Sequence, residues 1–391
     1  MKNRIKFLRL IVCLGLLAGI CFSFELWFAV NRTFPRAPLI FELPENSVIH
    51  VERCLTVILA ASLVSIIFSR RLKIAFVAAV ASLLLLILFD QNRLQPWVYQ
   101  YFLLLFVLAL RARQTEDESG LVTAIGLTQI IIAGLYFWSG AQKLNFSFSH
   151  EILPALLSPL ENLFPDFQFS FPWLGIGAAF AEISIGVGLL LRRTRNSAVY
   201  SAAVMHLIIL FFLIANGYNS IVWIWNATLI PMVFAAFWRF DVALERAIRT
   251  NGGLEGRTAK SITAASVLLP VLSFFGWWDM YLSGALYSGN VEVAAIRINR
   301  ELIEKLPPEA RENVFQTKKG NELMLPLFEW AMRDLNVPAY PERRVSKAVT
   351  GKVCELTNEK NQVELIVKER PAISDGSFRI SRISCAEIDG R

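Results

Sequence analysis

The sequence is short of charge. Charged side chains make up 18% of its 391 residues, whereas 55% are hydrophobic and the mean hydropathy is +0.48. A soluble domain carries roughly 25% charged residues, so this composition excludes an ordinary cytosolic enzyme. The net charge of +7 does not indicate a nucleic-acid binder, because the last 107 residues are nearly balanced in charge and the surplus lies between apolar runs. We therefore expect a lipid bilayer as partner and no nucleic acid.

Motifs for common chemistries are also lacking. The three histidines, at positions 50, 150 and 206, have no chelating spacing, so no metal site is expected. There is no glycine-rich phosphate loop and no Ser/His/Asp arrangement. Function must therefore be argued from membrane topology and from polar groups within the apolar segments.

Nine apolar segments approach the length of about 20 residues that crosses ~30 Å of hydrocarbon. Residues 216–219 (Asn-Gly-Tyr-Asn) divide one long uncharged run into a helical hairpin. The segment at 96–110 is the shortest, and merging it with a neighbour would change the count. The nine segments are 8–30, 53–69, 72–90, 96–110, 121–140, 172–191, 198–216, 220–238 and 262–284.

The first segment follows a basic start and lacks a small-residue cleavage site, so it is predicted to be a retained anchor. With the N-terminus in the cytoplasm, 17 Lys and Arg residues fall on the inner side. Five fall on the outer side: Arg32, Arg36, Arg53, Arg93 and Lys143. Cytoplasmic flanks are enriched in such residues, and nine crossings would place the tail in the periplasm of a bacterial inner-membrane protein. An even count would return the tail to the cytoplasm.

The predicted fold is thus an all-α polytopic membrane bundle, residues 1–284, with a small extramembrane α+β domain, residues 285–391. Within the tail we expect amphipathic helices at 291–306 and 323–335, and strands at 352–356, 363–367 and 378–383. Cys354 and Cys385 are compatible with a disulfide in an oxidising compartment.

Ionisable residues at membrane depth require an explanation. Glu182 and His206 lie ten residues before and after the turn at 192–196, which places both near the bilayer midplane, able to face each other. Such a pair could relay a proton or merely pin two helices together. Glu25 and Asp279 lie nearer the outer ends, where capping or solvation explains them.

The segment Tyr136-Phe-Trp138-Ser-Gly140-Ala-Gln-Lys143-Leu-Asn ends another apolar run. Gly134 and Gly140 allow close approach of a neighbouring backbone. Lys143 either extends its ammonium to the interface or, if desolvated, becomes a neutral amine able to act as a base.

This segment resembles the helix-end motif of the HTTM (horizontally transferred transmembrane) domain and of the vitamin K-dependent gamma-glutamyl carboxylases. A second stretch, Met205-His206-Leu207 leading to Asn216-Gly217, resembles a later helix of that family. The DoxX/MauE membrane proteins, associated with quinones and thiol redox, share a similar signature and are the competing assignment.

The resemblance implies that Lys143 acts as the base toward a hydroquinone. Glu182 and His206 are further catalytic candidates because they are ionisable residues at membrane depth. The resemblance also implies that Tyr136, Trp138 and Gly140 contact the cofactor, for which a quinone is the candidate. The tail is too short for a propeptide-binding domain, so carboxylation of protein glutamate is not expected. Two alternatives remain: a non-catalytic transporter or accessory subunit, and an export-linked redox partner that depends on the tail cysteines.

Overall fold

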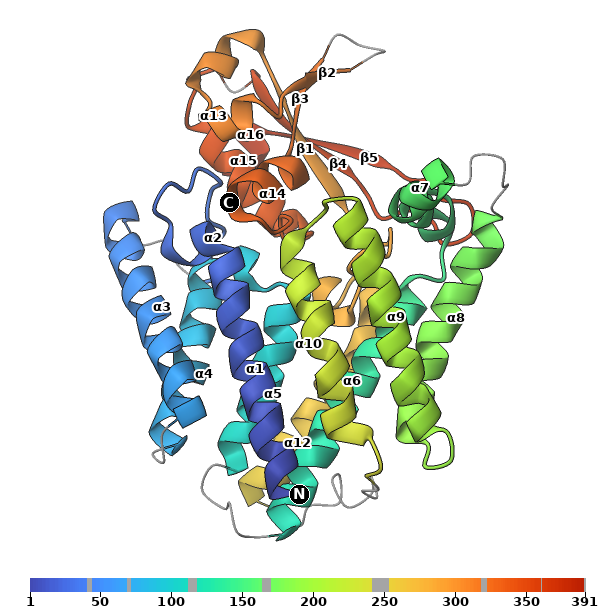
Figure 1. The fold of residues 1–391 in the computed structure, drawn as a ribbon. Helices are drawn as coiled ribbons and strands as arrows, with labels where there is room; N and C mark the ends of the chain where they lie inside the picture. The colour runs from blue at the N-terminus through green and yellow to red at the C-terminus, as the bar shows by residue number, and fades with distance from the viewer. Residues whose placement is uncertain are drawn as a thin grey trace.

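The computed structural model describes residues 1–40, 44–68, 72–111, 118–163, 170–240, 253–317, 322–359 and 361–389. Apolar helices form a bundle, and a small domain containing a sheet covers one end of it (Figure 1). The helices of the bundle are α1 (Lys2–Phe22), α2 (Phe24–Phe28), α3 (Glu45–Phe68), α4 (Leu72–Phe89), α5 (Pro96–Arg111), α6 (Glu118–Gln142), α7 (Leu153–Leu163), α8 (Phe171–Leu190), α9 (Arg195–Ala215), α10 (Ser220–Phe237) and α12 (Gly253–Thr263).

Seven helices in the described part of the chain are long and apolar enough to cross a bilayer, as in an integral membrane protein. The last of them runs from Gly256 to Phe275 and continues α12 through π-helical and 3₁₀ turns. Helices α4 and α5 are apolar but shorter. The predicted count of nine crossings therefore stays a prediction, whereas the mostly helical membrane bundle is confirmed.

The basic N-terminal segment and the C-terminal domain lie at opposite ends of the bundle. The N-terminus and the α8–α9 turn, with Arg192 and Arg193, lie at one end, and the C-terminal domain lies at the other (Figure 1). This arrangement separates the basic N-terminus from the tail by the length of the bundle, as the predicted topology requires.

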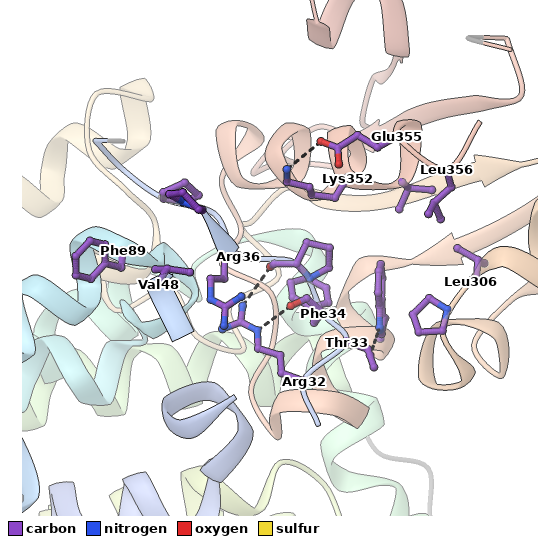
Figure 2. Close-up of a pocket in the computed structure, with 16 residues that line it drawn as sticks. Arg32, Thr33, Phe34, Arg36, Val48, Phe89, Leu306, Lys352, Glu355 and Leu356 are labelled. Atoms are coloured by element: carbon purple, nitrogen blue, oxygen red, sulfur yellow. Dashed lines mark hydrogen bonds and ion pairs between the residues drawn. The ribbon is translucent and has the colours of Figure 1, made fainter. Parts of the chain in front are cut away.

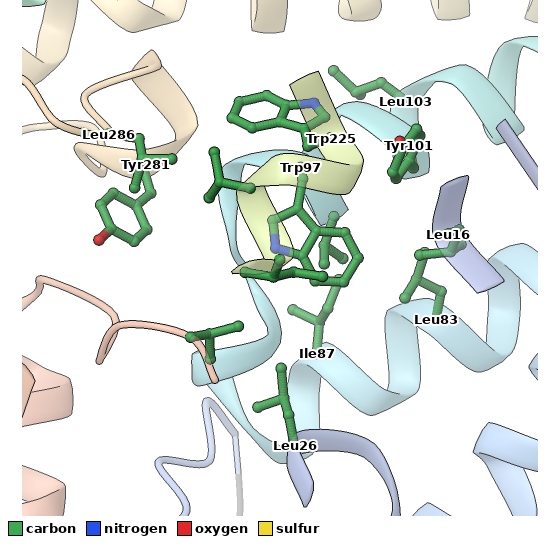
Figure 3. Close-up of a cluster of buried hydrophobic side chains, with 14 of the residues drawn as sticks. Leu16, Leu26, Leu83, Ile87, Trp97, Tyr101, Leu103, Trp225, Tyr281 and Leu286 are labelled. Carbon is green, nitrogen blue, oxygen red and sulfur yellow. The ribbon is translucent and has the colours of Figure 1, made fainter. Parts of the chain in front are cut away.

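Leucine and isoleucine side chains fill the bundle core around a few aromatic rings, among them Trp97, Tyr101 and Trp225 (Figure 3). Trp97 and Tyr101 lie one turn apart on α5, with ring centroids 6.4 Å apart. A Cβ added at Gly19 of α1 would clash with the Trp97 ring, so this glycine makes room for the indole. The Tyr101 hydroxyl is 2.6 Å from that of Thr228 on α10, which satisfies a polar group inside the apolar core.

The tail contains a five-stranded antiparallel sheet of order β2-β3-β1-β4-β5. The central strand pairs Ile296 with Leu325 on one side and with Leu365 on the other. The elements are β1 (Val293–Ile298), α13 (Pro308–Arg311), β2 (Phe315–Gln316), β3 (Leu323–Pro326), α14 (Leu327–Leu335), α15 (Arg343–Cys354), β4 (Val363–Lys368), β5 (Ile380–Ser384) and α16 (Cys385–Asp389).

The strands predicted at 363–367 and 378–383 are confirmed as β4 and β5. Two other predictions for the tail are wrong, and the helix predicted at 323–335 is confirmed only from Leu327 onward. Residues 291–306 form β1 and a 3₁₀ turn instead of a helix, because the sheet provides pairing partners on both sides of β1. Residues 323–335 begin as β3 before α14. Residues 352–354 end α15, whose buried Val345, Val349 and Val353 repeat every four residues, the helical period.

Cys354 and Cys385 form a disulfide that joins the ends of α15 and β5. The two residues are 5% and 0% exposed. Thiol–disulfide exchange with a partner protein requires access to one of the sulfur atoms. Because both cysteines are buried, we interpret this disulfide as a structural link.

Side chains from the loops of the bundle fix the tail in place. Gln95 donates to the carbonyl of Pro338 at 2.9 Å, and the side-chain oxygen of Asn92 accepts from the backbone N–H of Tyr340 at 3.2 Å. The carboxylate of Asp334 accepts from the backbone of Thr33 and Phe34. These contacts join segments about 240 to 300 residues apart in sequence, so tail and bundle pack as one unit.

Candidate functional site

Lys143 follows the C-terminal end of α6 and turns back toward α8. Its ammonium donates to Glu182 Oε2 at 2.5 Å and to Ser139 Oγ at 2.7 Å. The side chains of Lys143 and Glu182 are only 14% and 11% exposed. The lysine therefore does not extend to the interface; it forms an ion pair at membrane depth.

Glycines bring α6 and α8 close enough for this pair to form. A Cβ at Gly140 would lie 2.7 Å from the carbonyl oxygen of Ala179, and one at Gly186 would lie 2.7 Å from the backbone nitrogen of Phe137. The prediction of close backbone approach at Gly140 is confirmed. The glycine serves helix packing, and it does not line the cavity beside Lys143.

That cavity has a volume of about 860 Å³ and lies along α8 and α9, beneath α7. Its walls are almost entirely apolar, with Ile185, Met205 and Ile208 among them, and Lys143 and Glu182 supply the charged part. Several of its residues, including Tyr200 and Val204, are half exposed on the outer face of the bundle. The cavity is thus a groove open to the surrounding lipid, and we call it the α8–α9 groove.

His206 has partners other than the one predicted. Its Nε2 lies 2.5 Å from the Tyr136 hydroxyl and its Nδ1 lies 2.7 Å from Asn226 Oδ1. Asn226 in turn donates to the Val222 carbonyl at 2.8 Å. His206 and Glu182, which the sequence allowed to face each other, form no hydrogen bond, because the Lys143 side chain extends from the end of α6 to α8 and binds that carboxylate.

Trp138 faces away from the α8–α9 groove. Its indole N–H donates to the Val267 carbonyl at 3.1 Å, on the segment that follows α12. Consecutive residues on a helix point about 100° apart, so Tyr136 and Trp138 lie on opposite sides of α6. The structure brings Lys143 and Glu182 together at the groove, places Tyr136 and His206 behind it, and separates Trp138 from both.

The outer ionisable residues have local roles, as predicted. Glu25 accepts from the backbone N–H of Asn31 at 2.8 Å. Asp279 accepts from the Tyr340 hydroxyl at 2.7 Å and forms an ion pair with Arg344. These carboxylates organise the junction between bundle and tail.

Sequence reasoning missed a buried ionic network at the same junction. Arg93 and Glu52 form an ion pair of 2.7 Å with both side chains fully buried, and Arg32 pairs with Asp90 at the same distance. The sequence Asp90-Gln-Asn-Arg93 between two apolar runs was a signal for it, since charges so close to a membrane segment need partners. A second cavity of about 470 Å³ lies between this network and the tail, with Arg32, Arg36 and Lys352 on its wall (Figure 2).

Among the described residues, no group of three or more His, Cys, Asp or Glu side chains could hold a metal ion. The charged groups on the wall of the groove are one amine and one carboxylate, beside an apolar surface. Such a site suits a lipophilic molecule with a polar head.

Comparison of the chain with protein-family models, with curated proteins and with solved structures finds no match. The resemblance to the carboxylase and DoxX families thus stays a prediction. What the geometry defines is a class: a polytopic membrane protein with an ion pair on a lipid-facing groove.

Proposed function

We propose that the protein binds a quinone or a related lipophilic cofactor in the α8–α9 groove and exchanges a proton with it. One observation carries this proposal: the Lys143–Glu182 ion pair lies on the wall of a large apolar cavity instead of in water or in a packed core. A bilayer-dissolved ligand can reach such a groove from the side, and its polar head would find its charged partners at Lys143 and Glu182.

The pair is suited to proton transfer. The Lys143 ammonium donates to Glu182 Oε2 at 2.5 Å, so transfer of one proton along this hydrogen bond would leave a neutral amine beside the apolar wall of the groove. The neutral amine would take the proton from a hydroxyl of the reduced ligand, forming an N–H bond as the O–H bond breaks. Tyr136 and His206 lie behind the groove and would support helix packing there.

This proposal extends to the family. A gamma-carboxylase-like or DoxX-like bundle would use Lys143 in the role that the sequence motif suggests, as part of a redox or carboxylase-like enzyme.

A second candidate is a non-catalytic membrane component. It is favoured by the satisfied hydrogen bonds of Tyr136, His206 and Asn226, which tie α6, α9 and α10 together as a structural link would. In that case the Lys143–Glu182 pair would also only join α6 to α8, and the groove would hold ordinary lipid.

Extraction of bound quinone from the purified protein tests the two candidates. Wild type is expected to carry a stoichiometric quinone. K143Q and E182Q should bind it at least about tenfold more weakly and therefore retain less of it through purification, since a hydrogen bond to a charged group contributes about 1.5–3 kcal/mol. K260Q, on the exposed side of α12, makes the same substitution away from the groove and should retain the ligand. Equal quinone content in all four proteins, or none in any, would favour the non-catalytic candidate.

A further inference from the structure

The segment that leads from the bundle into the tail, Gly284–Asn290, is fixed against the turn that carries Lys143. Asn145 donates to the carbonyl of Ser288 at 2.8 Å, and Asn290 donates to Gln142 Oε1 at 2.7 Å. A Cβ at Gly289 would lie 2.9 Å from Cβ of Ser147, so the two segments touch directly. We call this segment the linker.

The linker contributes two residues to the wall of the α8–α9 groove. Leu286 and Tyr287 line the groove together with Lys143. They also line a smaller cavity of about 250 Å³ beneath the tail, so these two residues form the partition between the two spaces.

Tyr287 is held in an unusual conformation for a residue with a large side chain. Its φ of 55° lies in the left-handed region, which costs energy for any residue other than glycine. Strain of this kind persists where the surrounding structure enforces it, and it clusters at ligand-binding positions.

The hydroxyl of Tyr287 is buried and interacts with the side chain of Asn219, but it makes no hydrogen bond to any other group within the described part of the chain. Asn219 is 3% exposed, and its side-chain amide has no partner there other than Tyr287. A phenol and an amide can together make several hydrogen bonds, so a buried pair without a third partner points to a missing one. Burial raises the pKa of Tyr287 well above its usual value, so the phenol stays protonated and is a donor.

We propose that Tyr287, positioned by Asn219 beside it, is a second polar anchor of the α8–α9 groove and binds an oxygen atom of the ligand head other than the one that meets Lys143. The proposal rests on the proposed function and narrows it, because the ligand must then carry two separate oxygen functions. The anchor lies at the end of the groove nearest the tail.

The rest of the groove gives the orientation of the ligand. Its lining residues on α9 run from Leu213 back to Ser197, a span of about 24 Å at 1.5 Å per residue. Beyond the two anchors the wall on α9 is mainly apolar. A ligand held at the anchors would therefore extend a long hydrocarbon chain along α9 toward the opposite end of the bundle.

Binding of two defined probes to the full chain in detergent tests the anchor. Decyl-1,4-benzoquinone carries two ring oxygens and 4-decylphenol carries one, with the same chain. For the wild type and the variants Y287F and N219G, dissociation constants are measured by quenching of tryptophan fluorescence. Glycine at 219 tolerates the left-handed φ of 47° and so removes the side chain without strain.

The variants Y287F and N219G are expected to weaken binding of the quinone about three- to tenfold, the range for loss of one neutral hydrogen bond, and to leave binding of the phenol within twofold. The control is Y99F, which makes the same change on α5, outside the α8–α9 groove, and should bind both probes as wild type does.

Unchanged quinone binding in Y287F, with a loss in K143Q, would overturn the second anchor and leave the proposed function standing. A loss in Y287F but not in K143Q would support the anchor and contradict the role of Lys143. Failure of wild type to bind either probe would overturn both.

Discussion

At the scale of single residues, the charged side chains near the membrane are accounted for by partners inside the protein. The five cations predicted on the outer side all make internal contacts: Arg32 pairs with Asp90, Arg36 and Arg93 with Glu52, Arg53 with backbone carbonyls, and Lys143 with Glu182. Three carboxylates balance part of this positive charge and backbone carbonyls accept from Arg53, so partners within the protein stabilise these cations.

Glu342, at the junction of tail and bundle, should make stability depend on pH. Burial, with the nearby Asp279, raises its pKa to about 7, from 4.5. The folded protein therefore keeps a proton that the unfolded chain releases above about pH 4.5, so this group stabilises at low pH. Its contribution falls as pH rises from about 4.5 to 7, by up to about 3 kcal/mol.

The thermal unfolding midpoint of wild type and E342Q, measured from pH 5 to 8, checks this. E342Q lacks the titrating group, so the gap in midpoint between the two proteins should move in favour of E342Q as pH rises. Parallel profiles for the two proteins would show that Glu342 is not the group responsible.

At the scale of elements, the sequence allowed prediction of the membrane helices but not of the tail. Long apolar runs such as α8 and α9 have no alternative to a helix in hydrocarbon, so their positions were predicted within a few residues. In the tail, Val293–Ile298 is short and its structure is decided by pairing with β3 and β4, which are remote in sequence.

The candidate site could be predicted only in part, because it too depends on contacts between elements that are remote in sequence. Lys143, Glu182 and His206 stood out because each is ionisable within or beside an apolar segment. Their pairing depends on how closely α6 and α8 approach and on the reach of the lysine side chain, which one sequence does not reveal. Tyr287 and Asn219 were missed because an unpaired hydrogen-bonding group is visible only in three dimensions.

The contact between α6 and α8 yields a stability prediction. Alanine at Gly140 would place a Cβ 2.7 Å from the Ala179 carbonyl oxygen and force the helices apart, at a cost of about 1–3 kcal/mol. The control is Gly177 on α8. A Cβ at this position would have no atom within 4 Å, so G177A should be neutral or slightly stabilising. Unfolding midpoints in detergent compare the two variants, and an equal effect of both would argue against close packing at Gly140.

At the scale of the whole molecule, the tail and the basic N-terminus lie at opposite ends of the bundle (Figure 1). We propose that the N-terminus lies in the cytoplasm and the tail in the periplasm of a bacterial inner membrane, where the Cys354–Cys385 disulfide is stable. The α8–α9 groove would then present its ion pair toward the outer half of the bilayer.

Reporter fusions at the C-terminus test this orientation in bacteria. An alkaline phosphatase fusion, which needs export, should be active, and a green fluorescent protein fusion, which needs the cytoplasm, should be dark. The opposite result would place the tail inside and require an even number of crossings.

The account as a whole depends on the α8–α9 groove being a binding site for a lipophilic molecule with its head at Lys143. Photochemical cross-linking with an azide-bearing long-chain quinone, mapped by mass spectrometry, measures this most directly. The account predicts that labels concentrate on groove residues of α8 and α9, disappear with excess unlabelled quinone, and are lost in K143Q. Labels spread equally over other exposed faces, such as Val57 and Val64 of α3, and unaffected by competitor or by K143Q, would contradict it.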